Sequence, residues 1–285
     1  MKPLLLMNTL LVALLLACKR PDDATATLPL PPAVTPPASQ TVSPTTRKLV
    51  WADEFSTPGL PDSTKWGYEV GGNGWGNNEL QFYTSKRPEN ARVEGGKLII
   101  EARRETWENR GYTSARLLTR PTQTWTYGRI EAYARLPKGR GTWPAVWMLG
   151  KNISTAGWPR CGEIDIMEHV GYDEGMVHGS IHSESYNHVK GTQKTNKLKL
   201  ADVVNTFHLY AIEWTADQID FFIDDQQYYS VQRSALGNSE AQWPFNQPFY
   251  LILNLAVGGN WGGQQGVDET IWPQRMEVDY VRVYQ

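Results

Sequence analysis

The amino-acid sequence predicts an all-β sandwich over residues 47–285. Apolar side chains recur at every second position in short runs, which is the period of a strand with one buried face. β-Branched and aromatic residues dominate these runs, while glycine, proline and asparagine separate them. Amphipathic stretches of helical length are scarce. These observations indicate one domain of two antiparallel sheets, of about 240 residues.

The beginning of the chain predicts an export signal over residues 1–18. A lysine precedes an apolar stretch that is too short to span a bilayer comfortably. The last four residues of this segment, LLAC, resemble a bacterial lipobox. That resemblance implies cleavage before Cys18, a lipid on its thiol and, with Lys19 next, a place at the outer membrane. Secretion of a bacterial protein after cleavage near Ala17 is the alternative.

Residues 19–46 form a predicted linker. Proline, threonine, alanine and serine dominate it, and large apolar side chains are almost absent. Such a segment cannot bury enough apolar surface to offset the entropy lost on ordering. We expect a semi-extended tether that holds the domain away from a membrane, with lipidated Cys18 as the only membrane contact.

Within the domain, alternating runs mark the strands. The clearest lie at residues 97–102, 128–134, 207–214, 218–223, 249–254 and 276–283. Residues 198–205 predict a short helix or a loop.

Composition excludes some functions and favours others. The net charge is −2 and the pI about 6.2, so no positive field exists to hold nucleic acid. Twelve tryptophans and thirteen tyrosines exceed what a core of this size needs. Such a surplus is typical of a face that stacks on flat partners such as sugar rings, or of a protein interface.

Only two cysteines occur, Cys18 and Cys161. Because Cys18 belongs to the signal segment, no disulfide is expected in the domain. Cys161 lies two residues before a glutamate of interest. We interpret it as a small buried thiol rather than a nucleophile.

The most informative stretch is CGEIDIMEHV at residues 161–170. On a strand, Glu163 and Asp165 point to one side while the isoleucines that follow each of them point into the core. Strict alternation would place Glu168 on the opposite side. We therefore predict a one-residue β-bulge at residues 166–167, which returns Glu168 to the acidic side.

Three carboxyls on one face raise one another's pKa, so such a cluster is unfavourable when all its members are charged. Proteins retain such clusters where a shared proton is useful. The pattern fits retaining glycoside hydrolysis, in which one carboxylate attacks the anomeric carbon while a protonated one donates to the leaving oxygen. That route requires carboxyls about 5–5.5 Å apart. A calcium-binding acidic strand and a solvated sheet edge are the alternatives. The interleaved apolar residues argue against the edge.

At this point the sequence resembles glycoside hydrolase family 16, in its laminarinase-like branch. The resemblance begins with EIDIME and covers residues 48–285. Further matches follow in order: GWGNNELQFYT (74–84), YTSARL (112–117), WPAVWML (143–149), VGGNWGG (257–263) and VDYVRVY (278–284).

The resemblance implies a concanavalin A-like β-jelly roll with a substrate cleft on its concave sheet. It implies Glu163 as nucleophile, Asp165 as its assistant and Glu168 as general acid/base, with no cofactor for catalysis. The implied activity is endo-acting, retaining hydrolysis of β-1,3-glucan, with mixed-linkage β-1,3/1,4-glucan as a second substrate class. The bulged spacing is typical of the laminarinase branch.

Tryptophans predict the sugar-binding surface. Trp143 and Trp147 are four residues apart and so share one face of a strand, where two indoles can stack on successive sugar rings. Trp261 lies on a loop too rich in glycine to belong to the core. Trp75, on another glycine-rich loop, is placed to cover one end of the same surface.

Polar side chains complete that surface. The resemblance implies that Asn77 and Arg116 donate hydrogen bonds to sugar hydroxyls. Without the resemblance, we would interpret Asn77 as a turn residue and Arg116 as a surface charge. His182 lies on the predicted strand after the acidic one, and we expect it beside Glu168, where it would tune the proton of that acid. His178 shares its face, but the sequence offers no third ligand at zinc spacing.

A structural Ca²⁺ is the metal that the resemblance implies. Its ligands would be Glu54, the carbonyl of Gly96 and Asp279, all of which are oxygen donors that suit a hard cation. The ion would stabilise the fold rather than take part in the chemistry.

Other functions are compatible with the same sequence. An agarase-like hydrolase of galactans and a transglycosylase would use the same carboxyls, whereas a β-glucan-binding lectin would use only the surface. Retention of all three acids argues against the lectin. The WGNNE and WPAVW runs favour glucan, and we expect a monomer.

Overall fold

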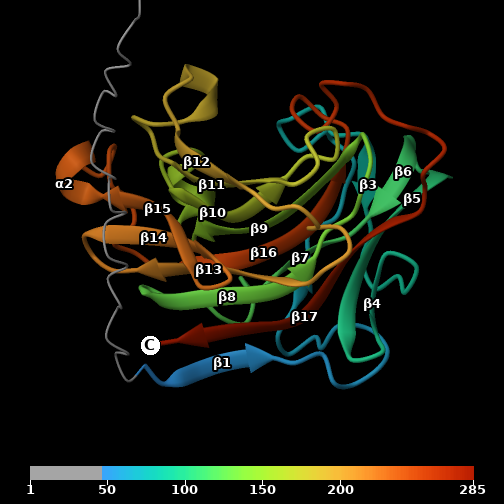
Figure 1. Ribbon diagram of the computed structural model, residues 1–285, viewed down its shortest axis with the longest axis horizontal. Coiled ribbons are helices and arrows are strands. Elements are labelled where there is room, and N and C mark those ends of the chain that lie inside the picture. The colour runs from blue at the N-terminus through green and yellow to red at the C-terminus, as the bar shows by residue number, and fades with distance from the viewer. Residues whose placement is uncertain (1–46) are drawn as a thin grey trace, which may run out of the picture. The chain divides into compact units, whose positions relative to one another are not determined.

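Two β-sheets packed face to face form the structure, a computed structural model that describes residues 47–285 (Figure 1). The predicted signal peptide at 1–18, its Cys18 and the linker at 19–46 lie outside the described residues. In the described part, no helix is both long and apolar enough to cross a membrane.

The larger sheet has ten strands. Its main path runs through β15 (Gln226–Gln232), β14 (Gln218–Ile223), β13 (His208–Trp214), β8 (Gly128–Arg135), β17 (Gln274–Tyr284), β5 (Lys97–Trp107), β6 (Arg110–Ser114) and β3 (Gln81–Tyr83). Two further strands extend it, β1 (Leu49–Asp53) against β17 and β4 (Ala91–Glu94) against β5.

The smaller sheet has seven strands and carries the acidic motif near its middle. Its order is β12 (Lys194–Lys199), β11 (Met176–His182), β10 (Glu163–His169), β9 (Thr142–Gly150), β16 (Phe249–Val257), β7 (Arg116–Leu118) and β2 (Gly67–Tyr68). The helical elements of the described chain are short: α1 (Ile153–Ala156), η1 (His188–Lys190) and α2 (Arg233–Leu236).

The predicted all-β sandwich is confirmed. The run at 218–223 coincides with β14, and the runs at 128–134 and 249–254 lie within β8 and β16. One pairing departs from the predicted purely antiparallel sheets, because β3 and β6 are parallel. Strand β6 returns along β5 as an antiparallel hairpin, which gives it the direction of β3.

Residues 198–205 form no helix. Strand β12 ends at Lys199 and a turn follows.

The facing sides of the two sheets bury the main apolar core. Alternate side chains of the smaller sheet meet alternate side chains of the larger one. They include Val146, Ile164, Ile166, Leu251 and Leu253 from one sheet and Ile130, Tyr210, Ile212, Phe221 and Val281 from the other. The remaining side chains of the smaller sheet therefore lie on its outer face, where the acidic motif is found.

A second apolar cluster lies on that outer face at one end. It consists of Leu118, Leu149, Cys161, Tyr250 and Ile252, and α1 packs against it together with Trp158. This cluster anchors the segment that leads into β10.

Candidate active site

Strand β10 contains the predicted bulge. Its pairing with β9 and β11 is regular as far as Asp165 and shifts register before Met167 and Glu168. Ile166 and Met167 are both fully buried in the core, so the extra residue shifts the alternation by one position. Glu168 therefore lies on the same side of the sheet as Glu163 and Asp165, as predicted.

Glu163 is held by groups on either side of its carboxylate. The indole Nε1 of Trp158 donates a hydrogen bond to Glu163 Oε2 at 2.9 Å. His182 Nε2 lies 3.7 Å from Glu163 Oε1 and 3.2 Å from Asp165 Oδ2. Asp165 also shares a hydrogen bond with Glu163. Asp165 is buried, whereas Glu163 stays half-buried at the surface of the sheet.

The position of His182 corrects one prediction. His182 pairs across the strands with Glu163, and His178 is the residue opposite Glu168. In an antiparallel hairpin the last residue of the second strand meets the first residue of the first strand. His182, at the end of β11, therefore contacts Glu163 and Asp165 rather than the expected Glu168.

Glu168 is held by a separate group of aromatic side chains. The indole Nε1 of Trp143 donates to Glu168 Oε1 at 3.0 Å. Trp261 packs edge-on against Trp143 with ring centroids 5.5 Å apart, and His178 packs against Trp261 at 5.0 Å. A Cβ at Gly262 would lie 2.8 Å from the Cβ of Trp143, so glycine permits this close approach of the loop. The sequence-predicted Trp143 and Trp261 thus meet at Glu168.

Trp147 lies on the same face and is fixed by polar and stacking contacts. Its Nε1 donates to Asn254 Oδ1 at 2.7 Å. The Arg116 guanidinium lies 4.7 Å from the Trp147 ring and 4.8 Å from that of Trp75, and Arg116 Nε pairs with Glu69 Oε2 at 2.6 Å. Arg116 is nearly fully buried. It therefore contacts two indoles of the face, and its expected role as a donor to sugar hydroxyls stays a prediction.

Asn77 lies where two loops distant in sequence meet. Its carbonyl accepts a hydrogen bond from the Asn260 backbone N–H at 2.7 Å, and Asn78 Nδ2 donates to Asn260 Oδ1 at 2.8 Å. Gly259 adopts a φ of +80°, and a Cβ there would approach the Asn77 carbonyl to 3.0 Å. The loops that carry Trp75 and Trp261 are therefore joined into one wall beside the acidic motif.

The three carboxyls share one electrostatic environment. Burial raises the pKa of Glu163, Asp165 and Glu168 to about 8 each. The negative charge of Asp165 raises the pKa of both glutamates further, while their indole donors act in the opposite direction. The three groups cannot all be ionised at neutral pH. Glu163 and Asp165 are close enough to share one proton, and Glu168 retains its own.

A fourth buried carboxyl, Glu79, adds to this field. Gln81 Nε2 donates to Glu79 Oε2 at 2.6 Å, and the Tyr83 hydroxyl donates to the same oxygen at 3.3 Å. Burial raises the pKa of Glu79, and the charge of Glu79 in turn raises that of Glu168. Glu79 therefore favours the protonated form of Glu168.

Sequence reasoning missed Trp158, Glu79 and Asn254 as site residues. Asn254 is the single polar residue in the apolar run FYLILNLAV of β16, and that interruption was a usable signal. Trp158 lies on the segment before β10, and its contact with Glu163 depends on how that segment packs on the second apolar cluster. Nothing in the local sequence reports such packing.

Cys161 is fully buried, as predicted, and is a free thiol among the described residues. Burial raises the pKa of its thiol to about 12. A thiol of this kind is not a nucleophile at neutral pH.

The residues proposed for calcium come together by strand register. Asp279 lies at a register shift of β17. On one side of it Val278 pairs with Leu98 near the start of β5, and on the other side Val281 pairs with Asp53 at the end of β1. Gly96 directly precedes β5 and Glu54 directly follows β1. Arg282 Nε and Nη2 donate to both carboxylate oxygens of Glu54, at 2.8 and 2.9 Å. The Glu54 carboxylate is therefore engaged by Arg282, whereas the main-chain carbonyl of Glu54 accepts only a long hydrogen bond, from the Ser56 hydroxyl at 3.5 Å.

Chemically, the outer face of the smaller sheet offers an attacking carboxylate and a proton donor. Glu163 becomes the charged partner whenever the shared proton resides on Asp165. Glu168 supplies an acidic proton from a separate, aromatic environment. Flat indoles flank both groups, which suits a substrate made of rings.

Comparison with known proteins matches this arrangement to one family. Residues 78–282 match the model described as glycosyl hydrolases family 16. A beta-glucanase of Rhodothermus marinus is 57% identical over 242 residues, which cover 83% of this chain and 85% of the relative.

Solved structures agree with that match. The X-ray structure of the laminarinase from Rhodothermus marinus superposes with a TM-score of 0.82 at 56% identity, over 84% of this chain and 97% of the other. SCLam, a non-specific endo-β-1,3(4)-glucanase crystallised in mutant form with a bound oligosaccharide, gives a TM-score of 0.81 at 48% identity over 85% and 96% of the two chains.

Proposed function

The chain belongs to glycosyl hydrolase family 16, and we propose that it hydrolyses internal β-1,3 linkages of glucan with retention of anomeric configuration. One observation carries this proposal: the bulge of β10 gathers Glu163, Asp165 and Glu168 on one exposed face, with an indole donor on each glutamate. The similarity to a laminarinase and to an endo-β-1,3(4)-glucanase supports glucan as the substrate, with mixed-linkage glucan as a second class.

In the first step, Glu163 attacks the anomeric carbon and Glu168 protonates the departing glycosidic oxygen. The bond from the anomeric carbon to that oxygen breaks as the bond to Glu163 forms. In the second step, Glu168, now a carboxylate, removes a proton from water, and the water oxygen displaces Glu163. Two inversions at the same carbon give net retention.

Asp165 serves the first step by holding the shared proton. When that proton lies on Asp165, Glu163 is charged and still accepts hydrogen bonds from Asp165 and from Trp158. His182 faces both acids and limits the charge that accumulates between them. Asp165 and His182 are therefore positioning residues, since they act through Glu163.

The sugar chain would lie across the indoles that flank the acids. Trp143 and Trp261 stand beside Glu168, and Trp147 and Trp75 stand on either side of Arg116. Asn77 joins the wall on which Trp75 and Trp261 lie. A ring stacked on an exposed indole contributes about 0.5–1.5 kcal/mol beyond area burial, if aromatic pairs are a guide.

Product analysis tests this function. Laminarin and curdlan should yield a ladder of oligosaccharides, with viscosity falling faster than reducing ends appear, because the cuts are internal. Lichenan should be cut and agarose left intact. Products from agarose would establish the galactan alternative, and glucan binding without any products would establish the lectin.

We also propose a structural Ca²⁺ held by the Glu54 carbonyl, the Gly96 carbonyl and Asp279. These oxygen ligands suit a hard cation. They lie where β1 and β5 pair with β17, so a bound ion would stabilise both strand pairs. Chelation with EDTA should lower the melting temperature, and added Ca²⁺ should restore it. The ion stabilises the fold and takes no part in the chemistry. A melting temperature that EDTA does not move would contradict the proposal.

We further propose that the protein is exported, anchored through a lipid on Cys18, and monomeric. The lipobox-like LLAC run supports this interpretation. Expressed with its signal, the chain should partition into the Triton X-114 detergent phase, and Cys18→Ser should move it to the aqueous phase. Equal partitioning of both forms would favour simple secretion.

A further inference from the structure

We propose that Glu163, Asp165 and His182 form a binding site for a zinc ion, and that zinc bound there inhibits the enzyme. The binding goes beyond the proposed hydrolysis and does not depend on it; only the inhibition rests on that function. One ligand atom from each of the three residues lies within 4.8 Å of the other two.

The spacing of these atoms fits tetrahedral zinc. With bonds of about 2.0–2.1 Å to nitrogen and oxygen, two ligand atoms on a tetrahedral zinc lie about 3.4 Å apart. His182 Nε2 is 3.2 Å from Asp165 Oδ2 and 3.7 Å from Glu163 Oε1, which brackets that value. The ligand oxygens of Glu163 and Asp165 lie within 4.8 Å of each other, so a bound ion would draw these two side chains together while His182 keeps its place.

The donor set selects zinc over harder cations. One imidazole nitrogen and two carboxylates suit Zn²⁺, whereas Ca²⁺ and Mg²⁺ prefer oxygen ligands alone. The pair His178 and His182 is not the site, because His178 packs against Trp261 and faces Glu168 across the strands.

Asp165 provides an independent indication that a cation is favourable here. Its side chain is 2% exposed, and its Oδ2 accepts no hydrogen bond from any residue of the described chain. A buried acceptor without a donor is energetically costly, and a metal ion satisfies it. This oxygen is the atom that faces His182 Nε2.

The partial exposure of Glu163 gives the ion access to the site, and binding to Glu163 explains the inhibition. Trp158 occupies Glu163 Oε2, which leaves Oε1 directed toward His182. The Glu163 side chain is 14% exposed, so an ion reaches the group from the outer face of the sheet. Zinc would hold the lone pair of Oε1 that the nucleophile needs, and three protein ligands would leave a fourth position for water.

Two inactive variants separate zinc binding from activity. Isothermal titration of zinc chloride into the purified enzyme should show one site, and EDTA should reverse both binding and the loss of laminarin hydrolysis. Glu163→Gln should weaken binding at least tenfold, while Glu168→Gln should bind zinc as the wild type does. Both variants lack turnover, so the difference cannot arise from catalysis.

A histidine pair provides the matched control. His182→Gln should weaken zinc binding at least tenfold, whereas His188→Gln should not, although its ring lies only 5.3 Å from that of His182. Circular dichroism would verify the fold of each variant. Equal zinc affinity of Glu163→Gln and Glu168→Gln, no single site in the wild type, or bound zinc without inhibition would overturn the proposal. Absence of glucan hydrolysis with this binding pattern intact would instead count only against the proposed function.

Discussion

Each of the two outer-face glutamates accepts one indole N–H, Glu163 from Trp158 and Glu168 from Trp143. An N–H donor stabilises the charged form of a carboxyl, whereas burial opposes it. Asp165 and His182 act on both glutamates, but His182 Nε2 lies 3.7 Å from Glu163 Oε1, whereas Glu168 has the additional negative charge of Glu79 in its field. Because that charge favours the protonated form of Glu168, this difference supports the proposed roles of Glu163 as nucleophile and Glu168 as acid.

Trp143→Phe tests the acid role of Glu168. The acid must be protonated, so kcat/KM should fall as pH rises through the Glu168 pKa, which burial raises to about 8. Loss of the indole donor destabilises charged Glu168, raises its pKa and should move the alkaline limb to higher pH. The measurement is the pH profile of kcat/KM on laminarin.

Trp147→Phe is the control for that profile, because the Trp147 indole donates to Asn254 and not to a carboxyl. It should weaken substrate binding and leave the alkaline limb in place. An equal displacement of the limb in both variants would show that Trp143 does not set the Glu168 proton.

At the scale of elements, the bulge of β10 determines which face Glu168 occupies. Deleting Met167 would remove the bulge and give Glu-Ile-Asp-Ile-Glu, in which strict alternation still places both glutamates on the outer face. Inserting an alanine after Met167 would turn Glu168 toward the core. The deletion should therefore keep measurable activity at a stability cost of about 2–5 kcal/mol for the lost core side chain.

The alanine insertion should abolish activity in the same assays, namely laminarin hydrolysis and urea unfolding. An active insertion variant, or a deletion variant that is folded but fully inactive, would contradict the role of the bulge.

The same strand shows what could be predicted from sequence. Ile164, Ile166 and Met167 all require burial, and only a bulge reconciles that requirement with Glu168 on the acidic face. The partner of Glu168 could not be predicted in this way, because it depends on the register of the β10–β11 hairpin. Register is set by the length of a loop and by contacts distant in sequence, so the expected cross-strand contact of His182 with Glu168 was wrong, although the charge of His182 does lower the pKa of Glu168.

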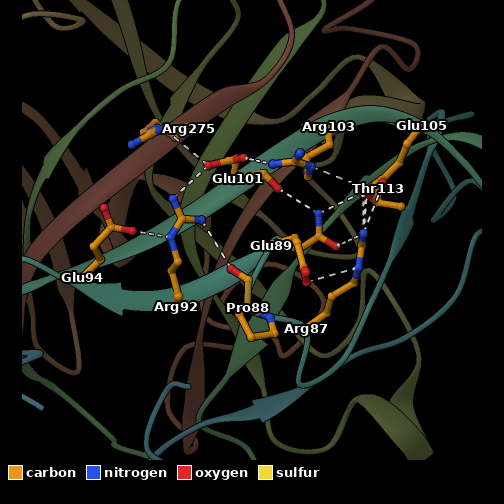
Figure 2. Close-up of polar contacts among 11 residues, drawn as sticks. Arg87, Pro88, Glu89, Arg92, Glu94, Glu101, Arg103, Glu105, Thr113 and Arg275 are labelled. Atoms are coloured by element: carbon orange, nitrogen blue, oxygen red, sulfur yellow. Dashed lines mark hydrogen bonds and ion pairs between the residues drawn. The ribbon is translucent and has the colours of Figure 1, made fainter. Parts of the chain in front are cut away.

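At the scale of the whole molecule, the outer face of the ten-stranded sheet carries an ion-pair network rather than a site (Figure 2). Glu101 on β5 is buried under Arg92, Arg103 and Arg275, which come from β4, β5 and β17. Arg87 pairs with Glu105 nearby. Ion pairs thus join three strands on the side of the sandwich away from the acidic motif.

Glu101→Ala should destabilise the fold by about 1.5–3 kcal/mol, because it removes a buried carboxylate that pairs with three arginines, which themselves stay partly exposed to water. Arg104→Ala is the control, since its ion pair with Glu269 is exposed at both ends and should contribute less than about 1 kcal/mol. Urea unfolding measures both, and kcat on laminarin should stay unchanged in each. A loss of less than about 1 kcal/mol in Glu101→Ala would show that the network adds no more stability than an exposed pair.

The sandwich as a whole was predictable because period-two patterning persists through most of its strands. The parallel pairing of β3 with β6 was not, since a strand of three residues carries too little pattern to reveal its direction. The wall formed around Asn77 and Asn260 was equally hidden, because residues so distant in sequence meet only through the folded backbone.

The anomeric configuration of products formed in azide tests the central claim most directly. Glu168→Ala should lose about 10²–10⁴-fold in turnover of laminarin and recover with azide on a substrate with a good leaving group. Its product should be the β-glycosyl azide, because azide displaces Glu163 from a covalent intermediate. Glu163→Ala should give the α-glycosyl azide by a single inversion. Azides of the same configuration from both variants, or the reverse pairing, would contradict the assigned roles of the two glutamates.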